Sequence, residues 1–556
     1  MNDDTAALEL RSFNHQLRRM AQPTPGVKDR HAVPPITLVP DDVLHTIFHF
    51  VAEYSYSRIA YVPIGRERGP RDGICVVSHV CGYWRRLALN DPQLWGYIVL
   101  NPDSSLAFLQ TYLERSKDAP LRIRLEGTRP TFNRNIEIDL RARLLADHVH
   151  RIVEFRAVEF RPTEMNTILK WFKGAAPRLR CLMLEADSQL LQPAVFSGNL
   201  PALRDIYVKG VSMPWQPYQD LTDLQLNDQL VPSMEKLVWT LRHCPRLKSL
   251  KLGFLDAMIR QDTGEQLCSV EPVALPRLEE LFLRSHVQED VVDLISCLRF
   301  PDTTSVSLKL LGWHRHTIVD LPKECPSLSA ITSKVKGLFL ELTGCDAWSA
   351  SIVMTSRKPE FKLQWEWYQE GKNNEMVDFI GLSPTTFPAL EALVIIATSY
   401  QLDVPHWRCI LSAFPCLVYL KLDISMSMIA NFWTALVPKF PRNENMLDAL
   451  VVPALRYLKV ERMEEQETVF NVLGECFRAR ANRGCRLRTL DLVMRSGRAF
   501  PPTVLDILTE NIGKVNITYV RNPYSLDEGE AHRAGSSRNS SHPRREPSMS
   551  PSILRP

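Results

Sequence analysis

The most constraining feature of this 556-residue chain is a short phrase that returns seven times. The phrase is a proline, one spacer, a leucine, two spacers, an aliphatic residue, one spacer and a second aliphatic residue. Its copies begin at Pro177, Pro201, Pro245, Pro276, Pro388, Pro415 and Pro453. Background composition would give well under roughly one such match in a chain of this length. The chain is therefore expected to contain a repeated structural unit.

The alternation at the end of each phrase predicts a β-strand whose aliphatic side chains point inward and whose other side chains point outward. Weaker copies begin at Leu221, Pro301, Pro326 and Leu487. Helical stretches lie between copies, for example at 290–298 and 468–477. Strand followed by helix, at intervals of about 25 to 30 residues, resembles the leucine-rich repeat family in its irregular form.

Two further regions bear on the extent of the repeats. Strands are predicted at 97–100 and 121–125, with a helix at 104–117 between them, so the array starts near residue 98. The stretch 334–387, which carries Trp348, Trp365 and Trp367, does not follow the phrase. A long insertion and two degenerate repeats both explain it.

The segment before the repeats predicts a small helical unit. Pro40, Asp41 and Asp42 favour a helix start, and apolar residues from Val43 to Val51 recur at helical spacing, so one face is expected to be buried. A second helical half runs from Cys75 to an Asp-Pro break at Asp91. About sixty residues are too few to bury all of this apolar surface.

At these residues the chain resembles the F-box family. The residues that meet the family pattern are Leu38, Pro40, Val43, Leu44, Ile47, Phe48, Val80, Cys81, Trp84, Arg85, Asp91, Pro92, Leu94 and Trp95. Val39 intervenes between Leu38 and Pro40, and a long segment through 65–73 replaces the usual short connection between the halves. The alternative is an ordinary helical hairpin whose apolar stripe is only core.

We therefore expect an α/β fold: a small N-terminal all-helical F-box module followed by a right-handed leucine-rich-repeat solenoid of strands and helices. The expected domains are a flexible segment with a short amphipathic helix at 1–34, the F-box-like module with a loop insertion at 35–97, the irregular repeats at 98–522 and a disordered Ser/Arg/Pro tail at 523–556.

Composition excludes several classes of function. The net charge of +4 gives no global case for nucleic acid binding. Neither a secretory leader nor a run of eighteen apolar residues occurs, so we expect no membrane span and a cytoplasmic or nuclear location. The 12 cysteines form no Cys-x-x-Cys pair, and those at 244, 297, 325, 416 and 476 look like reduced core thiols. No metal site, cofactor or catalytic motif is expected.

The F-box resemblance implies a partner, a Skp-type adaptor that connects to a cullin-RING ubiquitin ligase. We expect a non-catalytic substrate receptor; the alternatives are an interaction scaffold without ubiquitin transfer and, least favoured, an enzyme. The expected adaptor-binding residues are Leu38, Pro40, Val43, Leu44, Ile47, Phe48, Val80, Cys81, Trp84, Leu94 and Trp95.

Substrate recognition is assigned to the outward positions of the repeat strands. The expected residues are Tyr207, Lys209, Lys251, Phe282, Lys309, Tyr419, Lys421 and Lys459. Lysines beside aromatic residues suit an acidic or phosphorylated segment of an unknown protein substrate. The alternative is a solvated face on which Asp205, Glu280, Asp423 and Asp491 neutralise the lysines.

Overall fold

The computed structural model describes residues 39–58, 73–102, 104–127, 135–187, 195–198, 200–211, 218–228, 234–253, 271–286, 288–312, 325–344, 348–354, 361–367, 387–397, 402–437, 451–463, 467–495 and 500–520. The expected segment 1–34, Leu38 and the expected tail 523–556 lie outside these residues. Internal contacts divide the chain into two compact units, Met1–Arg156 and Ala157–Pro556. Each unit is described by itself.

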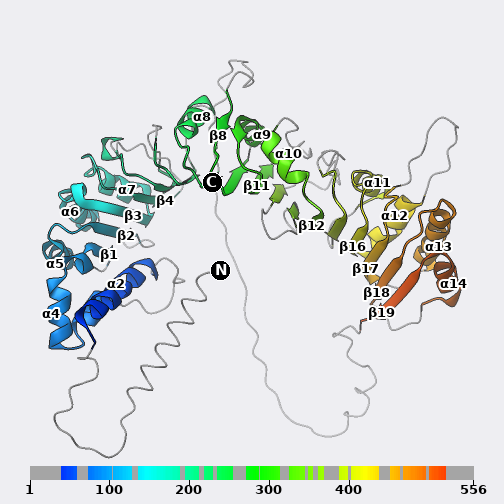
Figure 1. Cartoon of the computed structure of the whole chain (residues 1–556), viewed down its shortest axis with the longest axis horizontal. Helices are drawn as coiled ribbons and strands as arrows, with labels where there is room; N and C mark the ends of the chain where they lie inside the picture. The colour runs from blue at the N-terminus through cyan, green and yellow to red at the C-terminus, as the bar shows by residue number, and fades with distance from the viewer. Residues whose placement is uncertain are drawn as a thin grey trace, which may run out of the picture. The chain divides into compact units, whose positions relative to one another are not determined.

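Unit 1 begins with helices and continues into a small parallel sheet (Figure 1). Its elements are α2 (Asp41–Arg58), α3 (Gly73–Ser78), α4 (Gly82–Asn90), η3 (Pro92–Gly96), β1 (Tyr97–Leu100), α5 (Leu106–Ser116), β2 (Leu121–Glu126), α6 (Asn135–Ala146), η4 (Val149–Arg151) and the first half of β3 (Ile152–Phe160). The predicted strands at 97 and 121 and the helix between them are confirmed. We call α2, α3, α4 and η3 the helical module.

The helical module packs on the strands that follow it in the sequence. α2 packs on β1, and η3 packs on both β1 and β2. The first unit, Met1–Arg156, includes both of these strands. The domain limits given by the sequence stay predictions.

Unit 2 alternates strands with helices, and the helices lie along one side of the strands (Figure 1). Its helices are α7 (Pro162–Leu169), η5 (Val195–Gly198), α8 (Met234–Arg242), α9 (Gln288–Cys297), α10 (Pro326–Thr332), α11 (Val404–Ser412), α12 (Met426–Leu436), α13 (Glu467–Asn482) and α14 (Pro502–Asn511). The predicted helices at 290–298 and 468–477 are confirmed. Consecutive helices pack against each other from α11 to α14.

The strands of unit 2 form one continuous hydrogen-bonded sheet, with β8 (Val273–Ala274) and β10 (Leu298–Arg299) as a separate short parallel pair. Its strands are β4 (Cys181–Ala186), β5 (Asp205–Lys209), β6 (Asp223–Asn227), β7 (Ser249–Gly253), β9 (Glu280–Ser285), β11 (Ser305–Gly312), β12 (Gly337–Gly344), β13 (Trp348–Met354), β14 (Phe361–Trp367), β15 (Ala392–Ala397), β16 (Tyr419–Ile424), β17 (Tyr457–Met463), β18 (Thr489–Met494) and β19 (Lys514–Tyr519). Outside the β12–β14 region each strand pairs in parallel with the next.

The tryptophan-rich stretch interrupts this order. β11 pairs in parallel with β14 rather than with β12, and β12 pairs in parallel with β15. β13 runs antiparallel to both β12 and β14 and fills the space between them. The spatial order is therefore β11, β14, β13, β12, β15. The insertion interpretation fits this arrangement better than two degenerate repeats, because among the described residues of 325–367 a helix precedes β12 alone of these three strands.

One weak copy of the phrase was wrongly interpreted. Residues 326–331 form helix α10 rather than a strand. Pro326 occupies the first helical position, where its missing N–H costs nothing, and Leu328 and Ile331 are buried at helical spacing. The strand of this repeat is β12, which follows the helix.

The repeated phrase has a direct structural cause. In all seven strong copies the N–H of the phrase leucine donates to the carbonyl of the residue before the proline, at 3.1 to 3.3 Å. Proline therefore sits at the second position of a β-turn, for which its fixed φ is suited. The leucine after the turn is buried in every copy: Leu179, Leu203, Leu247, Leu278, Leu390, Leu417 and Leu455.

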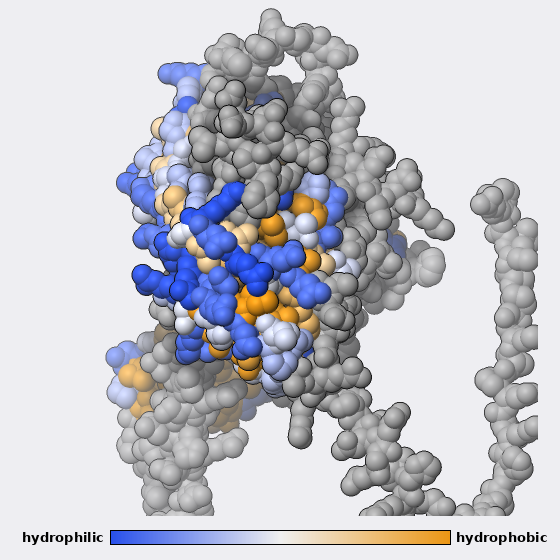
Figure 2. Space-filling view, turned by 90° about the vertical axis from the view of Figure 1, so that its right-hand side faces the viewer, coloured by the Kyte–Doolittle hydropathy of each residue, from blue (hydrophilic) through white to orange (hydrophobic). Residues whose placement is uncertain are grey.

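Core burial continues along the strands and weakens at the last one. The two aliphatic positions of each strong copy are buried, as predicted, for example Leu182 and Leu184 at 0% exposure. On β19 the corresponding Val515 and Ile517 are only half-buried, and Tyr519 is 45% exposed. Figure 2, which faces this end of unit 2, shows hydrophobic residues grouped among hydrophilic ones.

The cysteine prediction holds for four of the five named thiols. Cys244, Cys297, Cys325 and Cys476 are buried, whereas Cys416 is exposed. Burial raises the pKa of Cys244 to about 11 and that of Cys476 to about 12, so both thiols are unreactive at neutral pH.

Two searches of the described residues bear on membranes and metals. None of the helices described here combines the length and apolar character needed to cross a membrane. Within the same residues, no three side chains of His, Cys, Asp or Glu come together as a set of metal ligands.

Candidate docking surface on the helical module

Helix α2 begins directly after Pro40, so the proline flanks the helix and does not occupy its first position. The N–H of Leu44 donates to the carbonyl of Pro40 at 3.1 Å. Asp41 and Asp42 lie in the first turn, where carboxylates interact favourably with the helix dipole. The hydroxyl of Tyr83 donates a hydrogen bond to the carboxylate of Asp41, which raises the pKa of Tyr83 and ties α4 to the start of α2.

One face of α2 belongs to the core. Leu44 and Phe48 are completely buried, and Ala52 and Tyr56 continue the same face with 4% exposure each. The ring of Phe48 lies 5.0 Å from that of Trp84, which joins α2 to α4. The four buried side chains of α2 hold the module together and present no surface to a partner.

A second face of α2 is apolar and exposed. Val43, Ile47, Phe50 and Tyr54 are spaced by three and four residues and therefore share one stripe, which we call the α2 stripe. Val43 is 43% exposed, Phe50 68% and Tyr54 53%. Large apolar side chains aligned outward on a helix mark an interaction site. The apolar residues that the sequence assigned to one face of this helix therefore lie on two faces, because Leu44 is buried and Val43 is exposed.

Two further valines are exposed nearby, Val76 within α3 at 52% and Val80 in the connection from α3 to α4 at 55%. The next residue, Cys81, is exposed and caps α4, because its Sγ accepts the N–H of Trp84 at 3.4 Å. α3 approaches α2 closely at Gly73, where a Cβ would stand 2.3 Å from Ser55 Oγ and 2.9 Å from a backbone oxygen. Glycine is therefore required for this approach.

Asp91 links the two halves of the module. Its Oδ2 bonds His45 Nδ1 at 3.2 Å and His49 Nε2 at 3.0 Å, and its Oδ1 accepts the N–H of Gln93 at 3.0 Å. The same carboxylate thus caps η3 and holds two turns of α2. We call this arrangement the Asp91 clasp.

Leu94 and Trp95 follow the clasp and are buried at 0% and 1% exposure. The indole N–H of Trp95 donates to the carbonyl of Ala88 at 2.8 Å, and its ring packs against Tyr112 at 5.0 Å. The guanidinium of Arg115 covers the ring at 4.3 Å. This tryptophan anchors η3 to α4 and α5.

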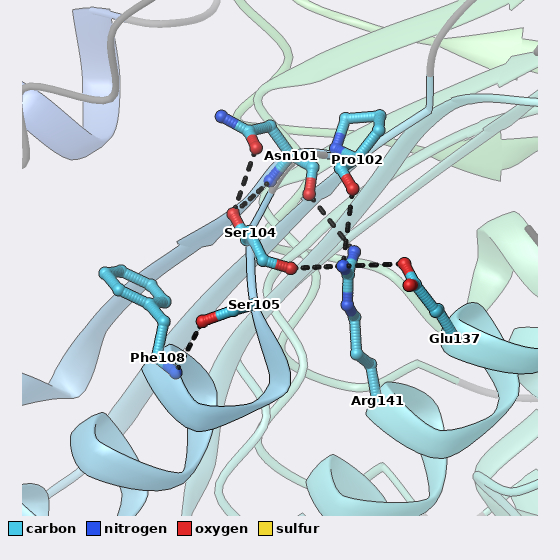
Figure 3. Close-up of polar contacts among 7 residues, drawn as sticks. All are labelled: Asn101, Pro102, Ser104, Ser105, Phe108, Glu137 and Arg141. Atoms are coloured by element: carbon cyan, nitrogen blue, oxygen red, sulfur yellow. Dashed lines mark hydrogen bonds and ion pairs between the residues drawn. The ribbon is translucent and has the colours of Figure 1, made fainter.

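Arg141 on α6 holds the turn between β1 and α5 (Figure 3). Its guanidinium donates to the backbone carbonyls of Asn101 at 3.1 Å, Pro102 at 3.3 Å and Ser104, and it contacts Glu137 at 3.3 Å. The Ser104 hydroxyl closes the turn by donating to Asn101 Oδ1 at 3.0 Å. Arg141 is 9% exposed, so this network serves to fix the turn rather than to bind a ligand.

The structure sorts the expected adaptor-binding residues into three groups. Leu44, Phe48, Leu94 and Trp95 are core residues; Val43, Val80, Cys81 and Pro40 are exposed; Ile47 and Trp84 are half-buried. Only the last two groups can contact a partner directly. Phe50, Tyr54 and Val76 were missed, although continuing the helix past Val51 at the same spacing would have found the first two.

The outward strand positions of unit 2 lie where expected, and ion pairs occupy several of them. Lys209 bonds Glu185 at 3.0 Å, and Lys251 bonds Glu280 at 2.8 Å. Glu461 accepts both Lys421 at 2.9 Å and Lys459 at 3.0 Å. Tyr207, Phe282 and Lys309 are half-buried, and Tyr419 is 36% exposed. We call these outward positions the strand face.

The comparison with protein families identifies residues 36–101 as an F-box-like domain. This match covers the helical module and β1 and gives no assignment for unit 2. The comparison with curated proteins found no match to this chain. The chain is thus a mixed α/β protein with an N-terminal helical F-box-like region and an extended sheet of mainly parallel strands.

Proposed function

We propose that this protein is the substrate-recognition subunit of a Skp/cullin/F-box-type ubiquitin ligase. The helical module binds a Skp-type adaptor, and unit 2, as an irregular leucine-rich-repeat array, binds the target protein. The chain supplies no catalytic residue. It holds a substrate near a charged ubiquitin carrier, which raises the effective concentration of the reacting groups.

One observation supports the adaptor assignment more than any other. The α2 stripe exposes Val43, Phe50 and Tyr54 on a helix whose opposite face already fills the core of the module. A helix with two apolar faces buries one against its own domain and has the other available to a partner helix. The F-box-like match at 36–101 covers this helix.

The test removes the stripe without disturbing the core. We expect Val43→Asp combined with Phe50→Asp to lower affinity for the adaptor by roughly 100-fold or more, because each exposed anchor is expected to act as an interface hot spot. Isothermal titration of the purified full chain with the adaptor measures this. Since both side chains are exposed, the free energy of unfolding should change by less than roughly 0.5 kcal/mol.

The matched control is Ile136→Asp, which introduces the same charge at an apolar residue of unit 1 that is 76% exposed on α6. This variant should bind the adaptor normally. Unchanged adaptor affinity in the double variant would disprove the proposed docking surface. Equal losses of affinity in the double variant and in the control would show that the effect is not specific to α2.

The second candidate is a protein interaction scaffold that is not coupled to ubiquitin transfer. The extensive mutual pairing of charges on the strand face of unit 2 is compatible with it. The two functions separate in a reconstituted reaction with adaptor, cullin-RING ligase, ubiquitin-activating enzyme and ubiquitin carrier. Ubiquitin chains on a protein held by unit 2 support the receptor; adaptor binding without any transfer supports the scaffold.

A further inference from the structure

Two neighbouring strands of unit 2 present the same sequence of side chains on the strand face. The shared order is tyrosine, lysine and carboxylate at successive outward positions: Tyr419, Lys421 and Asp423 on β16, and Tyr457, Lys459 and Glu461 on β17. The strands are parallel and in register, so each side chain stands beside its counterpart. We call Tyr419 and Tyr457 the tyrosine pair.

The charged residues of this arrangement are paired with one another. Glu461 accepts both Lys421 at 2.9 Å and Lys459 at 3.0 Å. Asp423 forms an ion pair with Arg462, which lies at an irregularity of β17 and has a φ of 63°. A positive φ is uncommon outside glycine and is often found near functional sites. Here it brings a cation onto the carboxylate of the neighbouring strand.

The tyrosine pair differs from the charged residues beside it. Tyr419 is 36% exposed and Tyr457 38%, and among the described outward strand positions of unit 2 they are the large apolar side chains that are exposed. No hydrogen bond reaches either phenol group within the described residues. A phenol hydroxyl can both donate and accept. The pair therefore combines aromatic surface with two hydrogen-bonding groups that have no partner in this part of the chain.

The surroundings of the pair limit how a partner can be recognised. Its neighbours in the same row are small, Ala392 on β15 and Thr489 on β18, so both rings project beyond them. The other outward residues of β15, Val394 and Ile396, are apolar and half-buried. Both edges of β16 and of β17 are already paired within the sheet. A partner must therefore contact side chains here, because it cannot add a strand.

We propose that the tyrosine pair binds a proline-rich segment of a partner protein in the polyproline II conformation. Such a segment has no internal hydrogen bonds, so its carbonyl groups can accept from the two phenol hydroxyls. Proline-rich segments dock in grooves lined by aromatic side chains. Because the conformation is already extended, binding costs little conformational entropy.

The charges near the pair favour a neutral ligand. Lys421, Lys459 and Arg462 are matched by Asp423 and Glu461, and Asp491 on β18 stands beside Lys459 in the register. Three cations thus face three carboxylates. A surface without net charge complements neutral carbonyl groups better than a strongly acidic or strongly basic segment.

This inference rests on the proposed function, because it gives a chemistry to the protein that unit 2 would hold. It keeps Tyr419 from the expected substrate-binding residues and adds Tyr457, its register partner. In this arrangement Lys421 and Lys459 do not contact the partner through free charges, since Glu461 bridges them. They support the surface from which the two rings project.

The experiment uses the purified full chain, immobilised, and measures the retention of fluorescent peptides. The probes are two peptide libraries with degenerate positions x, one with the fixed pattern Pro-x-x-Pro and the other with Ala-x-x-Ala. We expect the proline library to be retained and the alanine library to be retained weakly. Tyr419→Ala with Tyr457→Ala should reduce retention of the proline library by roughly thirtyfold or more, the effect of losing an interface hot spot.

A second variant separates the hydroxyl groups from the rings. Tyr419→Phe with Tyr457→Phe keeps both aromatic rings and removes both donors. Retention of the proline library should fall by roughly fivefold, because neutral hydrogen bonds make a modest net contribution. Unchanged retention in this variant would contradict the assigned hydrogen bonds to the carbonyl groups of the segment.

The matched control is Tyr207→Ala with Phe282→Ala, which removes two aromatic residues from the strand face on β5 and β9. It should leave retention unchanged. Equal losses in the control and in the alanine variant of the tyrosine pair, or equal retention of the two libraries by the unmodified chain, would overturn the proposal. A dimer of the unmodified chain that the alanine variant dissociates, without preference for the proline library, would instead assign the pair to self-association.

Folding and adaptor binding are scored in every sample. Should Tyr419→Ala with Tyr457→Ala fail to fold, the phenylalanine variant carries the test, because it keeps the rings in place. Loss of peptide retention with adaptor binding intact supports the tyrosine pair as the site. Failure of the unmodified chain to bind the adaptor contradicts the proposed function, whereas normal adaptor binding without preference for the proline library contradicts this inference alone.

Discussion

The α2 stripe and the strand face of unit 2 are both directed to solvent, but their side chains are arranged differently. On the stripe, Val43 and Phe50 leave apolar surface exposed, with 43% and 68% of their area open. On the strand face, outward residues largely satisfy one another, as Lys421, Lys459 and Glu461 do. The first surface gains from any apolar partner helix, whereas the second discriminates through charge and hydrogen bonding.

This difference decides whether a substitution changes partner binding or the stability of the free protein. Removing a stripe residue should change binding and leave the free energy of unfolding nearly the same, because an exposed side chain contributes little to the stability of its own domain. Removing a paired charge from the strand face changes the unbound protein first. Variants at Trp95, Asp91 and Glu461 can break this division between the two surfaces, and the first two also test whether the buried face of the module is separate from its exposed one.

The largest effect is expected at Trp95, on the buried side of the module. Trp95→Ala should lower the free energy of unfolding of unit 1 by about 3–5 kcal/mol, since it leaves a cavity beside Tyr112 and removes the bond to Ala88. Adaptor binding should fall together with folding, which circular dichroism and denaturant titration measure. A variant that stays folded but loses adaptor binding would show that Trp95 reaches the surface after all.

A smaller loss is expected from the Asp91 clasp. Asp91→Ala removes the cap of η3 and the bonds to His45 and His49, so unit 1 should lose about 1–2 kcal/mol of stability. Because the α2 stripe lies on another face of the helix, adaptor affinity measured below the unfolding transition should change little. A large loss of affinity without loss of stability would place the clasp in the interface. Asp42→Ala, an exposed acidic residue in the first turn of α2, serves as the control.

The smallest effect concerns Glu461 and depends on pH. Partial burial works to raise the pKa of Glu461, but hydrogen bonds from Lys421 and Lys459 outweigh it and leave the pKa below the ordinary value of 4.5. A depressed pKa gives stability that is present above the ordinary value and is lost as pH falls through the lowered one.

Glu461→Gln should therefore cost roughly 0.5–1 kcal/mol at neutral pH, and the difference from the unmodified protein should vanish in acid. Thermal unfolding at a series of pH values measures it. If the difference in stability between the variant and the unmodified protein persisted at low pH, Glu461 would contribute by packing and not by charge. The contrast drawn here between a charge-paired strand face and an apolar α2 stripe would then be wrong at this residue.

Local signals in the sequence predicted local structure well. The phrase predicted turn, strand and burial because its proline, leucine and aliphatic positions each have one physical role, which the turn at Pro177 and the burial of Leu179 illustrate. The helix-start residues at 40–42 and the apolar spacing after them likewise predicted helix α2. These features depend on residues within a few positions of one another.

Features that depend on distant residues could not be predicted. The pairing of β11 with β14 joins segments more than fifty residues apart in the sequence, and no phrase marks it. The separation of Val43 from Leu44 required knowing which side of α2 the rest of the module covers. The neighbourhood of Tyr419 and Tyr457 follows from strand register, and a shift of one residue would have turned one of them inward.

The reversed order of β12, β13 and β14 has a consequence for the way unit 2 acquires its structure. An array in which each strand pairs with the next can grow by adding one repeat at a time, with little chain entropy lost at each step. At β11 this growth stops, because its neighbour β14 is made only after β12 and β13. The strands before β12 and those after β14 can then order independently. The antiparallel segment β12–β14 joins them through contacts of larger sequence separation, which form more slowly.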